Sequence, residues 1–407
     1  MKYVILLGDG MGDYPVAALG HKTPLQYART PRMDYMAREG TLGLVETIPP
    51  GFVPGSDVAN ITVLGYNPAE VYSGRAPLEA INMGIHLASG DVAFRCNLVS
   101  LRGEGSGEIM DDFTAGHITS AEGGELIRAL QSVCGDDDFS FHAGVGYRHL
   151  LVWRKGNERI KTTPPHDITG EKIDIYQPSG KDGSVLRSLM ERARAVLRDH
   201  PVNRRRLAEG KKEANAIWLW GQGKAPVMAP LTEKYGIRGG VISAVDLLNG
   251  LGICAGLDVL HVEGATGYID TNYRGKAEAA LDCLRDRDFV FVHVEAPDEM
   301  GHEGNMEGKI KAIEDFDAQV VGTVLQGLGA FDSWRLLVLP DHPTPLSLKT
   351  HAADPSPFAV LSSRKDENLR NGQAFSEAEA ALTGIRLSPG YELMDCFIKD
   401  WRRIIAP

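Results

Sequence analysis

Residues 289–302 read FVFVHVEAPDEMGH, and this stretch decides the fold class of the chain. Its first part, Phe289–Val294, is a short run rich in β-branched and aromatic residues, which is typical of a central strand covered on both faces of a sheet. Glu295, Asp298 and His302 follow directly. The sequence therefore predicts a buried strand that leads into acidic and imidazole side chains.

Two further runs have the same form. Tyr3–Leu7 leads to Asp9, and Leu336–Leu339 leads to Asp341 and His342. In open α/β sheets, ligands bind beyond the carboxyl ends of the strands. We therefore expect these acidic and His side chains to lie together at a ligand-binding edge.

A helix is predicted between the runs that begin at 289 and 336. Apolar residues from Lys309 to Leu325 recur at the spacing of one helical face. Strand, helix and strand in this order favour a right-handed crossover and a mostly parallel sheet. The expected fold class is therefore α/β, with a mostly parallel sheet flanked by helices.

Residues 90–180 have a different pattern. Short strand-like pieces alternate with turns rich in Gly, Asp and Pro, and one helix is expected at 121–133. This pattern predicts a smaller α+β domain inserted into the main domain, which would comprise 1–89 and 181–407. A strand at 216–220 is expected to return the chain to the main sheet.

Composition limits the functional classes. The 407 residues include 43 Lys and Arg against 54 Asp and Glu, a net charge of −11, and the 43% hydrophobic content excludes a largely disordered chain. The acidic balance argues against nucleic-acid and anionic-membrane partners. An anionic substrate would then need local positive charge, from metal ions or a few converging basic side chains.

The sequence indicates a cytoplasmic protein. No apolar run is long enough to span a bilayer, and the apolar N-terminal run is interrupted at Gly8 with no small-residue cleavage site after it. The five cysteines lie far apart without a C-x-x-C pair, which indicates reduced thiols.

Three Asp and three His follow strand ends or lie in the loops beyond them. Asp298 and His302 are four residues apart, so on a helix they share one face and can bind one metal ion. Mixed carboxylate and imidazole ligands suit Mn²⁺ or Zn²⁺, and about six of them suit a two-metal site. Taken singly, Asp298 could instead cap a helix, and Asp341 with His342 could form an ordinary turn. The full set is Asp9, Asp298, His302, Asp341, His342 and His351.

A Gly- and Pro-rich loop holds a single serine. Residues 49–60 read PPGFVPGSDVAN, and a helix could begin near Val58. Ser56 at a helix N-terminus could be an N-cap, or a nucleophile whose alkoxide a metal ion stabilises. Arg75, behind a glycine turn, could bind a phosphate with both arms of its guanidinium group.

These residues, in this order, resemble the alkaline phosphatase superfamily, and more closely its archaeal-type 2,3-bisphosphoglycerate-independent phosphoglycerate mutases. The resemblance covers nearly the whole chain and implies an alkaline-phosphatase-like α/β domain with an inserted lid domain that closes over the substrate. The matching stretches are 9–13, 54–57, 74–80, 94–97, 200–203, 264–272 and 341–345.

The resemblance also implies roles for particular residues. Ser56 would become phosphoserine. One metal ion would be held by Asp298, His302 and His351, and the other by Asp9, Asp341, His342 and the Ser56 oxygen. Mn²⁺ is the expected ion, with Zn²⁺, Mg²⁺ and Co²⁺ as alternatives. The expected contacts to a small phosphorylated substrate are Arg75, Arg95, Arg148, His166 and Lys276.

One departure from the family pattern bears on the substrate. Mutases of this type tend to show an Asp-Arg-Arg-Ala-Gly-Arg stretch, whereas residues 111–117 read DDFTAGH. An Arg-poor lid should bind phosphoglycerate less well, and an extra Asp could pair with the ammonium group of an amino acid.

Three functions follow as alternatives. The first is interconversion of 3-phosphoglycerate and 2-phosphoglycerate through phosphoserine, without 2,3-bisphosphoglycerate. The second is a homoserine kinase-like phosphotransferase of threonine biosynthesis, although no Gly-x-x-x-x-Gly-Lys loop is present. The third is a non-catalytic metal-binding scaffold. No nucleic-acid or membrane partner is expected, and a homo-oligomer is compatible with the sequence.

Overall fold

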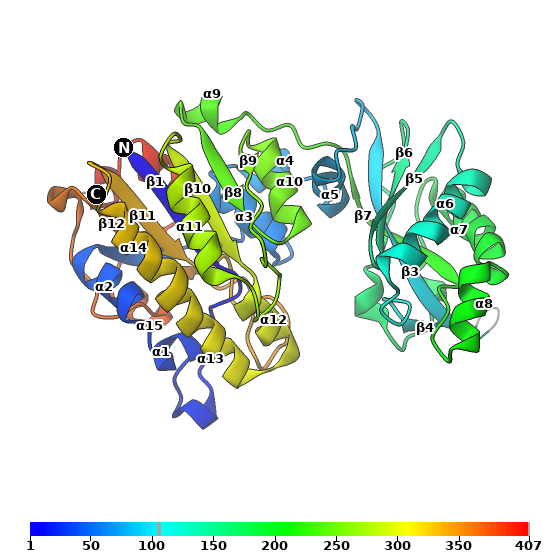
Figure 1. Cartoon of the computed structure of the whole chain (residues 1–407), viewed down its shortest axis with the longest axis horizontal. Coiled ribbons are helices and arrows are strands. Elements are labelled where there is room, and N and C mark those ends of the chain that lie inside the picture. Colours follow the sequence, from blue (N-terminus) through cyan, green and yellow to red (C-terminus); the bar gives the residue numbers. More distant parts are fainter. Residues whose placement is uncertain (104–106, 406–407) are drawn as a thin grey trace. The chain divides into compact units, whose positions relative to one another are not determined.

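The computed structural model describes residues 1–103 and 107–405 (Figure 1). The chain divides into two compact units. Unit 1 comprises Met1–Tyr72 and Val227–Pro407, and unit 2 comprises Ser73–Pro226.

Unit 1 is built on an eight-stranded sheet with the order β13-β2-β12-β11-β1-β10-β8-β9. Neighbouring strands are parallel except where β12 pairs with β11 and with β2. The predicted mostly parallel sheet is thereby confirmed. The strands are β1 (Lys2–Gly8), β2 (Thr41–Val45), β8 (Gly239–Ile242), β9 (Asp258–Val259), β10 (Phe289–Val294), β11 (Trp334–Leu339), β12 (Ser356–Ser362) and β13 (Arg386–Leu387).

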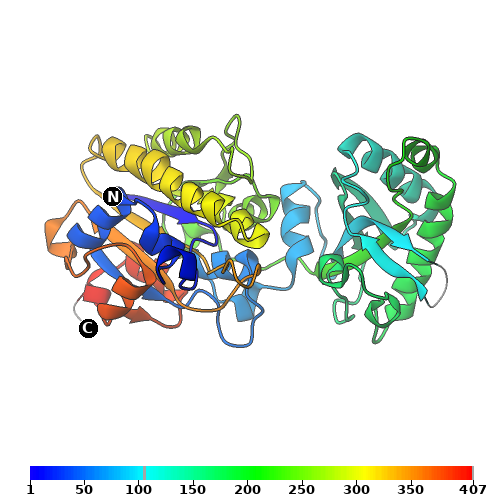
Figure 2. The same cartoon turned by 90° about the horizontal axis from the view of Figure 1, so that it is seen from below.

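Helices flank this sheet. Figures 1 and 2 show the helical segment of residues 306–328 lying across one face. The helices of unit 1 are α1 (Pro24–Tyr27), α2 (Pro31–Glu39), α3 (Ser56–Val63), α4 (Pro68–Val71), α9 (Leu231–Tyr235), α10 (Asp246–Cys254), α11 (Tyr273–Cys283), α12 (Ala296–Glu303), α13 (Met306–Asp315), α14 (Gly322–Leu328), α15 (Glu377–Leu382), α16 (Glu392–Ile398) and α17 (Arg402–Ile405), with short 3-10 turns η1 (Ala17–Leu19) and η6 (Lys365–Glu367).

The central strands are buried on both faces, as their continuous apolar sequence predicts. In β1, Val4 and Leu6 pack in one core cluster with Phe316 of the helical segment. The alternate residues Ile5 and Leu7 are also fully buried. Since both faces of β1 are covered, its own side chains are not exposed to a ligand, and the residues that follow its carboxyl end are placed to meet one.

The predicted helix from Lys309 to Leu325 is present, with one irregular turn. A π-helical segment, η5 (Phe316–Val321), joins α13 to α14. Its Asp317 is fully buried and accepts hydrogen bonds from the backbone N–H groups of Arg32 and Met33, at 3.0 and 2.7 Å. This irregular segment therefore supplies an acceptor to the first turn of α2, which hydropathy periodicity could not predict.

Unit 2 is an α+β unit with a five-stranded sheet in which β4, β3, β6 and β5 are neighbours and β7 pairs with β3. All of these pairings are antiparallel. The elements are α5 (Arg75–Asn82), β3 (Val92–Arg102), β4 (Ile109–Asp112), α6 (Ser120–Cys134), β5 (Phe139–Val145), β6 (Arg148–Trp153), the 3-10 turns η3 (Pro165–Ile168) and η4 (Asp174–Tyr176), α7 (Gly183–Arg198), α8 (Pro201–Ala208) and β7 (Ala216–Gly223).

The observed bounds of the inserted unit are wider than the predicted 90–180. The expectation that the strand at 216–220 returns to the main sheet was wrong, because β7 pairs along β3 from Ala216 to Gly223. Helix α7 packs against β7 and α6, so it also belongs to unit 2. A short apolar strand carries no local signal of which sheet it joins.

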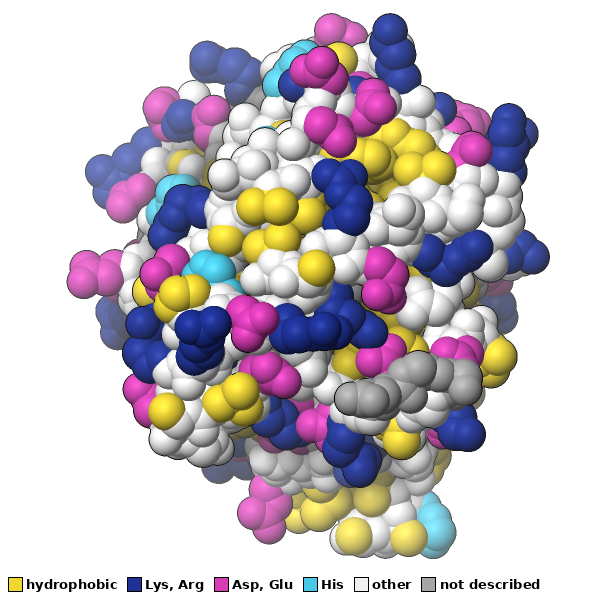
Figure 3. Space-filling model, turned by 90° about the vertical axis from the view of Figure 1, so that its right-hand side faces the viewer, with side chains coloured by type: hydrophobic (Ala, Val, Ile, Leu, Met, Phe, Trp, Pro, Cys, Tyr) yellow, Lys and Arg dark blue, Asp and Glu magenta, His cyan; other side chains and the backbone are white. Residues whose placement is uncertain are grey.

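The face of the molecule seen in Figure 3 is mixed in charge, with Lys and Arg side chains lying among Asp and Glu side chains. Among the residues that the structure describes, no helix has the length and apolar character needed to cross a membrane.

Candidate active site

Three neighbouring strands end together at one edge of the main sheet. In the parallel pairing, Leu7 of β1 lies opposite His293 of β10 and Leu339 of β11. Asp9 follows β1 directly, and Asp341 follows β11 after one intervening residue. Helix α12 begins two residues after β10. The strand ends therefore bring together side chains that are about 300 residues apart in sequence.

The first group of side chains is formed around Asp298, the third residue of α12. One helical turn later, His302 places Nε2 3.1 Å from Asp298 Oδ2. His351 Nε2 lies 3.6 Å from Asp298 Oδ1 and 3.0 Å from His302 Nε2. Thr344 donates a hydrogen bond to Asp298 Oδ1. Asp298 is thus not a helix cap, and the one-face geometry expected from the four-residue spacing is present.

Backbone carbonyls orient both histidines of this group. His302 Nδ1 lies 3.0 Å from the carbonyl oxygen of Lys349, and His351 Nδ1 lies 3.3 Å from that of Pro54. Since a carbonyl only accepts, each Nδ1–H donates. Both rings therefore turn Nε2 toward Asp298, which is how metal-ligating histidines are commonly held.

Charge balance couples Asp298 to these imidazoles. Burial acts to raise the pKa of Asp298, but hydrogen bonds from His302 and His351 hold it well below its usual range. Burial likewise acts to lower the pKa of His302, but its bond to Asp298 raises it to about 9. A buried carboxylate is therefore balanced by positive charge, which a divalent cation can supply in place of a proton.

The second group contains Asp9, Asp341, His342 and Ser56. His342 Nε2 lies 3.5 Å from Asp9 Oδ1 and 3.5 Å from Asp341 Oδ2. Asn60 donates to Asp341 Oδ2 at 2.9 Å, and the backbone N–H of Gly10 donates to Asp341 Oδ1 at 3.1 Å. The three ligand candidates are fully buried, so Asp341 and His342 are not an ordinary exposed turn.

Ser56 points into this second group. Its Oγ lies 3.1 Å from His342 Nε2 and 3.5 Å from Asp9 Oδ1. Gly55 is the N-cap of α3, and Ser56 is the first helical residue. The N-cap interpretation of Ser56 is therefore wrong, because Gly55 holds that position and the Ser56 hydroxyl contacts His342 and Asp9.

A third group joins Asp9 and Glu295, which the sequence placed at strand ends, to His293, which the sequence analysis did not single out. His293 Nε2 lies 2.8 Å from Asp9 Oδ2 and 3.4 Å from Glu295 Oε2, while its Nδ1 lies 3.1 Å from Ser243 Oγ. Burial lowers the pKa of His293 to about 3, and burial with the charge of Asp298 raises that of Glu295 to about 8. The available signal was a single imidazole inside an otherwise apolar strand.

The donor set fits divalent cations. Within each of three trios the ligand atoms lie within 4.8 Å of one another. Burial and the charges of Asp341 and Glu295 raise the pKa of Asp9 well above its usual range, a repulsion that bound cations relieve. Oxygen and imidazole nitrogen donors suit Mn²⁺ or Zn²⁺. The trios are Asp298, His342 and His351; Asp9, Asp341 and His342; and Asp9, His293 and Glu295.

Four of the five predicted substrate contacts lie in unit 2. Arg95 is buried on β3, and its Nε lies 3.1 Å from Glu79 Oε2. Arg75 Nε lies 3.1 Å from the other oxygen of Glu79. The Arg95 guanidinium also stacks on Trp220, 4.6 Å from the ring centroid. Burial lowers the pKa of Arg95 to about 10, with the neighbouring Arg75 and Arg148 contributing. Arg75, Arg95 and Arg148 therefore form one cationic cluster, the arginine cluster.

His166 borders this cluster, and Lys276 does not belong to it. The His166 ring packs edge-on against Trp220, with centroids 5.2 Å apart. Lys276 lies in unit 1, fully buried, and donates to the carbonyl oxygen of His293 at 3.1 Å. Burial lowers the pKa of Lys276 to about 8, against the raising effect of Glu295. The structure thus places Lys276 beside His293 of the third group.

The acidic pair in the divergent 111–117 segment has cationic partners. Lys212 Nζ lies 2.8 Å from Asp111 Oδ2 and 3.4 Å from Asp112 Oδ2. Asp112 also accepts from the hydroxyl and the backbone N–H of Thr114. Arg102 Nε also lies 3.3 Å from Asp111 Oδ1, so the two carboxylates have two cationic partners within the protein.

A chain with this sheet and this buried set of carboxylates, imidazoles and one hydroxyl is an α/β enzyme whose site suits divalent cations. A family model described as 2,3-bisphosphoglycerate-independent phosphoglycerate mutase matches residues 37–203. A protein of Geobacter sulfurreducens, named probable 2,3-bisphosphoglycerate-independent phosphoglycerate mutase, is 56% identical over 98% of this chain and 100% of its own length. The mutase of Methanosarcina barkeri is 53% identical over 98% of this chain and 100% of its own. The chain belongs to the 2,3-bisphosphoglycerate-independent phosphoglycerate mutase family.

Solved structures agree with this assignment. The PH0037 protein of Pyrococcus horikoshii superposes with a TM-score of 0.82 at 29% identity, over 99% of this chain and 97% of that one. The cofactor-independent phosphoglycerate mutase of Thermoplasma acidophilum gives 0.66 at 28% identity, over 98% and 99%. The resemblance seen in the sequence is confirmed. The relatives compared are named mutases, and the homoserine kinase alternative has no support among them.

Proposed function

We propose that this protein interconverts 3-phosphoglycerate and 2-phosphoglycerate through a phosphoserine at Ser56, without 2,3-bisphosphoglycerate. The observation that supports this most strongly is the position of the Ser56 hydroxyl. It makes no capping bond to the helix and lies between His342 and Asp9, at 3.1 and 3.5 Å. A scaffold that only held metal ions would not require a hydroxyl between two ligands.

In this proposal two divalent cations, Mn²⁺ by preference, are held by the first two groups. Bound there, they would offset the negative charge of the transferring phosphoryl group and favour the deprotonated serine. One ion is assigned to Asp298, His302 and His351, and the other to Asp9, Asp341, His342 and Ser56 Oγ.

The chain's own groups then perform two transfers. Ser56 Oγ forms a bond to phosphorus as the substrate's ester bond breaks, and glycerate stays bound. In this first transfer Ser56 gives up its proton and the freed oxygen of glycerate takes one up. In the second transfer the other hydroxyl of glycerate bonds to phosphorus and gives up its proton, while Ser56 Oγ is released from phosphorus and takes one up. Every bond and proton is restored over one cycle, so the net change is the position of the phosphate on glycerate.

Unit 2 is assigned the recognition of the substrate's anionic groups. Arg75 and Arg95 share Glu79, which fixes both guanidinium groups in place. Fixed guanidinium groups recognise carboxylate and phosphate oxygens well, because little entropy is lost on binding. Arg148 and His166 are further candidates in the same unit. Lys212 pairs with both Asp111 and Asp112, and Arg102 also pairs with Asp111, so two cations offset the two carboxylate charges that an amino-acid ammonium group would need.

The test compares Ser56→Ala with Thr62→Ser in the same helix. Thr62 Oγ1 only bonds the carbonyl oxygen of Val58 at 3.0 Å, which serine can reproduce. We expect Ser56→Ala to abolish mutase activity while Mn²⁺ binding persists, and Thr62→Ser to remain active. Chelation should remove wild-type activity and added Mn²⁺ should restore it. Phosphorylation of homoserine by ATP, without mutase activity, would contradict the proposal.

A further inference from the structure

Lys309 on α13 is a buried cation close to, but outside, the proposed metal ligands. It is fully buried and its ammonium group makes three short contacts. Nζ donates to the carbonyl oxygens of Gly12 and Thr344, at 3.0 and 2.8 Å, and lies 2.8 Å from Asp13 Oδ2. Three acceptors satisfy all three ammonium protons.

The three contacts join two loops that hold metal-ligand candidates. Gly12 and Asp13 continue the segment that begins with Asp9, and Thr344 follows Asp341 and His342. These loops come from opposite ends of the chain, and the backbone N–H of Thr344 also donates to the carbonyl oxygen of Gly12 at 3.1 Å. Lys309 therefore ties the two loops together through contacts with both of them.

Thr344 extends this network to the other ligand group. Its hydroxyl donates to Asp298 Oδ1, while its carbonyl oxygen accepts from Lys309. Helix α12, which contains Asp298, packs so closely on this loop that a Cβ at Gly301 would lie 2.5 Å from the Thr344 carbonyl oxygen. One buried ammonium group thus contacts a loop that borders both proposed ion positions.

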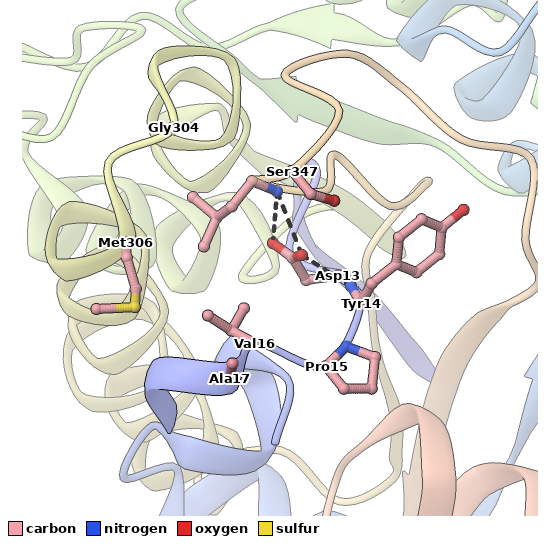
Figure 4. Close-up of a pocket in the computed structure, with 9 residues that line it drawn as sticks. Asp13, Tyr14, Pro15, Val16, Ala17, Gly304, Met306 and Ser347 are labelled. Atoms are coloured by element: carbon pink, nitrogen blue, oxygen red, sulfur yellow. Dashed lines mark hydrogen bonds between the residues drawn. The ribbon is translucent and has the colours of Figure 1, made fainter. Parts of the chain in front are cut away.

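Asp13 is used inside the protein rather than presented to a ligand. It lies at the wall of a pocket of about 370 Å³, yet its carboxylate turns toward the backbone of the 346–347 segment (Figure 4). Both of its oxygens lie 3.2 Å from the backbone N of Leu346. Asp13 therefore serves as the counter-ion of Lys309.

We infer that Lys309 is a positioning residue for the two-metal site, which fixes the loops at 9–13 and 341–344 so that the ligands of both ions converge. This inference rests on the proposed function. It predicts that removing the ammonium group weakens metal binding by more than the accompanying loss of stability accounts for.

A matched control exists in the same unit. Arg335 and Glu367 also form a buried ion pair, with Arg335 Nε 2.8 Å from Glu367 Oε2 and a further bond to the carbonyl oxygen of Phe397. These partners hold the C-terminal segment against β11 and β12. Removing the Arg335–Glu367 pair should therefore lower the stability of the protein without changing its affinity for Mn²⁺.

The experiment measures Mn²⁺ binding by titration calorimetry, together with thermal midpoints, kcat and KM. Lys309→Met keeps the apolar stem of the side chain. The double variant Asp13→Asn with Lys309→Met removes both charges of the pair, so that neither is left buried without its partner. We expect both variants to bind Mn²⁺ at least about 10-fold more weakly. Their kcat should fall by a larger factor than their KM changes. The double variant Arg335→Met with Glu367→Gln should have a thermal midpoint similar to that of the Lys309 variants. It should nevertheless bind Mn²⁺ with wild-type affinity.

Wild-type Mn²⁺ affinity in either folded Lys309 variant would overturn the inference, as would failure of both variants to fold, which would make Lys309 a folding residue. The calorimetric readout needs no substrate. Lys309 can therefore be judged even if wild-type protein shows no mutase activity, a result that would overturn only the proposed reaction.

Discussion

At the scale of single residues, the candidate site depends on neighbours that the sequence does not mark. Asp9, Asp341 and His342 could be predicted because each follows an apolar strand. His293 could not, because it lies within the strand itself and only the pairing with β1 brings it 2.8 Å from Asp9. Whether Ser56 was the N-cap of α3 was also undecidable, since capping depends on the backbone path of one residue.

Asn60 gives a test at this scale. Its side-chain amide donates to Asp341 Oδ2 at 2.9 Å and to the carbonyl oxygen of Ser56 at 2.8 Å. Groups that orient metal ligands typically contribute about 10–100-fold to affinity or activity. We expect Asn60→Ala to lower activity by roughly that factor while the protein stays folded by circular dichroism. Unchanged Mn²⁺ affinity and unchanged activity would show that Asn60 does not position these groups.

At the scale of elements, helix and strand identities were predictable and strand partners were not. The central strands have continuous apolar sequences that fit a doubly covered sheet. The strand at 216–220 has the same character, yet it pairs with β3 in the smaller sheet. The π-helical segment Phe316–Val321 was likewise invisible, because its one wide turn leaves the apolar face of the helix continuous.

The contact between α12 and the 341–344 loop gives a second test. A methyl group at Gly301 would lie 2.5 Å from the Thr344 carbonyl oxygen, so helix and loop would have to separate. Overpacking of this kind costs about 1–3 kcal/mol. We expect Gly301→Ala to lower the thermal midpoint and weaken Mn²⁺ binding. The control Gly329→Ala meets only an ordinary contact at 3.5 Å, and an equal loss there would refute this explanation.

Asp317 in the π-helical segment predicts a pH dependence of stability. Burial raises its pKa to about 6, although the backbone N–H of Met33 favours the ionised form. Because the folded pKa lies above the unfolded value, this group's stabilisation is complete below about pH 4 and is lost as pH rises through 6.

Asp317→Asn removes that titration and keeps a carbonyl acceptor for α2. Urea unfolding of both proteins should show wild type losing up to about 3 kcal/mol relative to the variant between pH 4 and pH 7. A difference that stays constant over this range would mean that Asp317 has an ordinary pKa.

At the scale of the whole molecule, the chain separates two tasks. The described residues of unit 1 contain the carboxylates, imidazoles and hydroxyl of the candidate active site, and those of unit 2 contain the arginine cluster. The inserted nature of unit 2 was predictable from its turn-rich pattern. Its bounds at 73 and 226 were not, because they depend on β7 and α7 packing into the smaller unit.

This division predicts separable kinetic defects. Arg95→Met should raise KM for phosphoglycerate by at least about 10-fold, because a charge-assisted contact to an anion contributes roughly 1.5–3 kcal/mol. Mn²⁺ affinity should not change. The control is Arg194→Met, which removes another ion pair of unit 2, with Glu108 at 2.8 Å. Equal KM values for the two variants would exclude Arg95 from substrate binding.

The central claim is that Ser56 accepts the phosphoryl group, and rapid-quench labelling tests it most directly. Enzyme loaded with Mn²⁺ is mixed with phosphate-labelled 3-phosphoglycerate, stopped within one turnover and digested. We expect label on the peptide that contains Ser56, no label in the Ser56→Ala variant, and label in the 2-phosphoglycerate product. Turnover of substrate to product with no label on Ser56, and with Ser56→Ala still active, would contradict the claim.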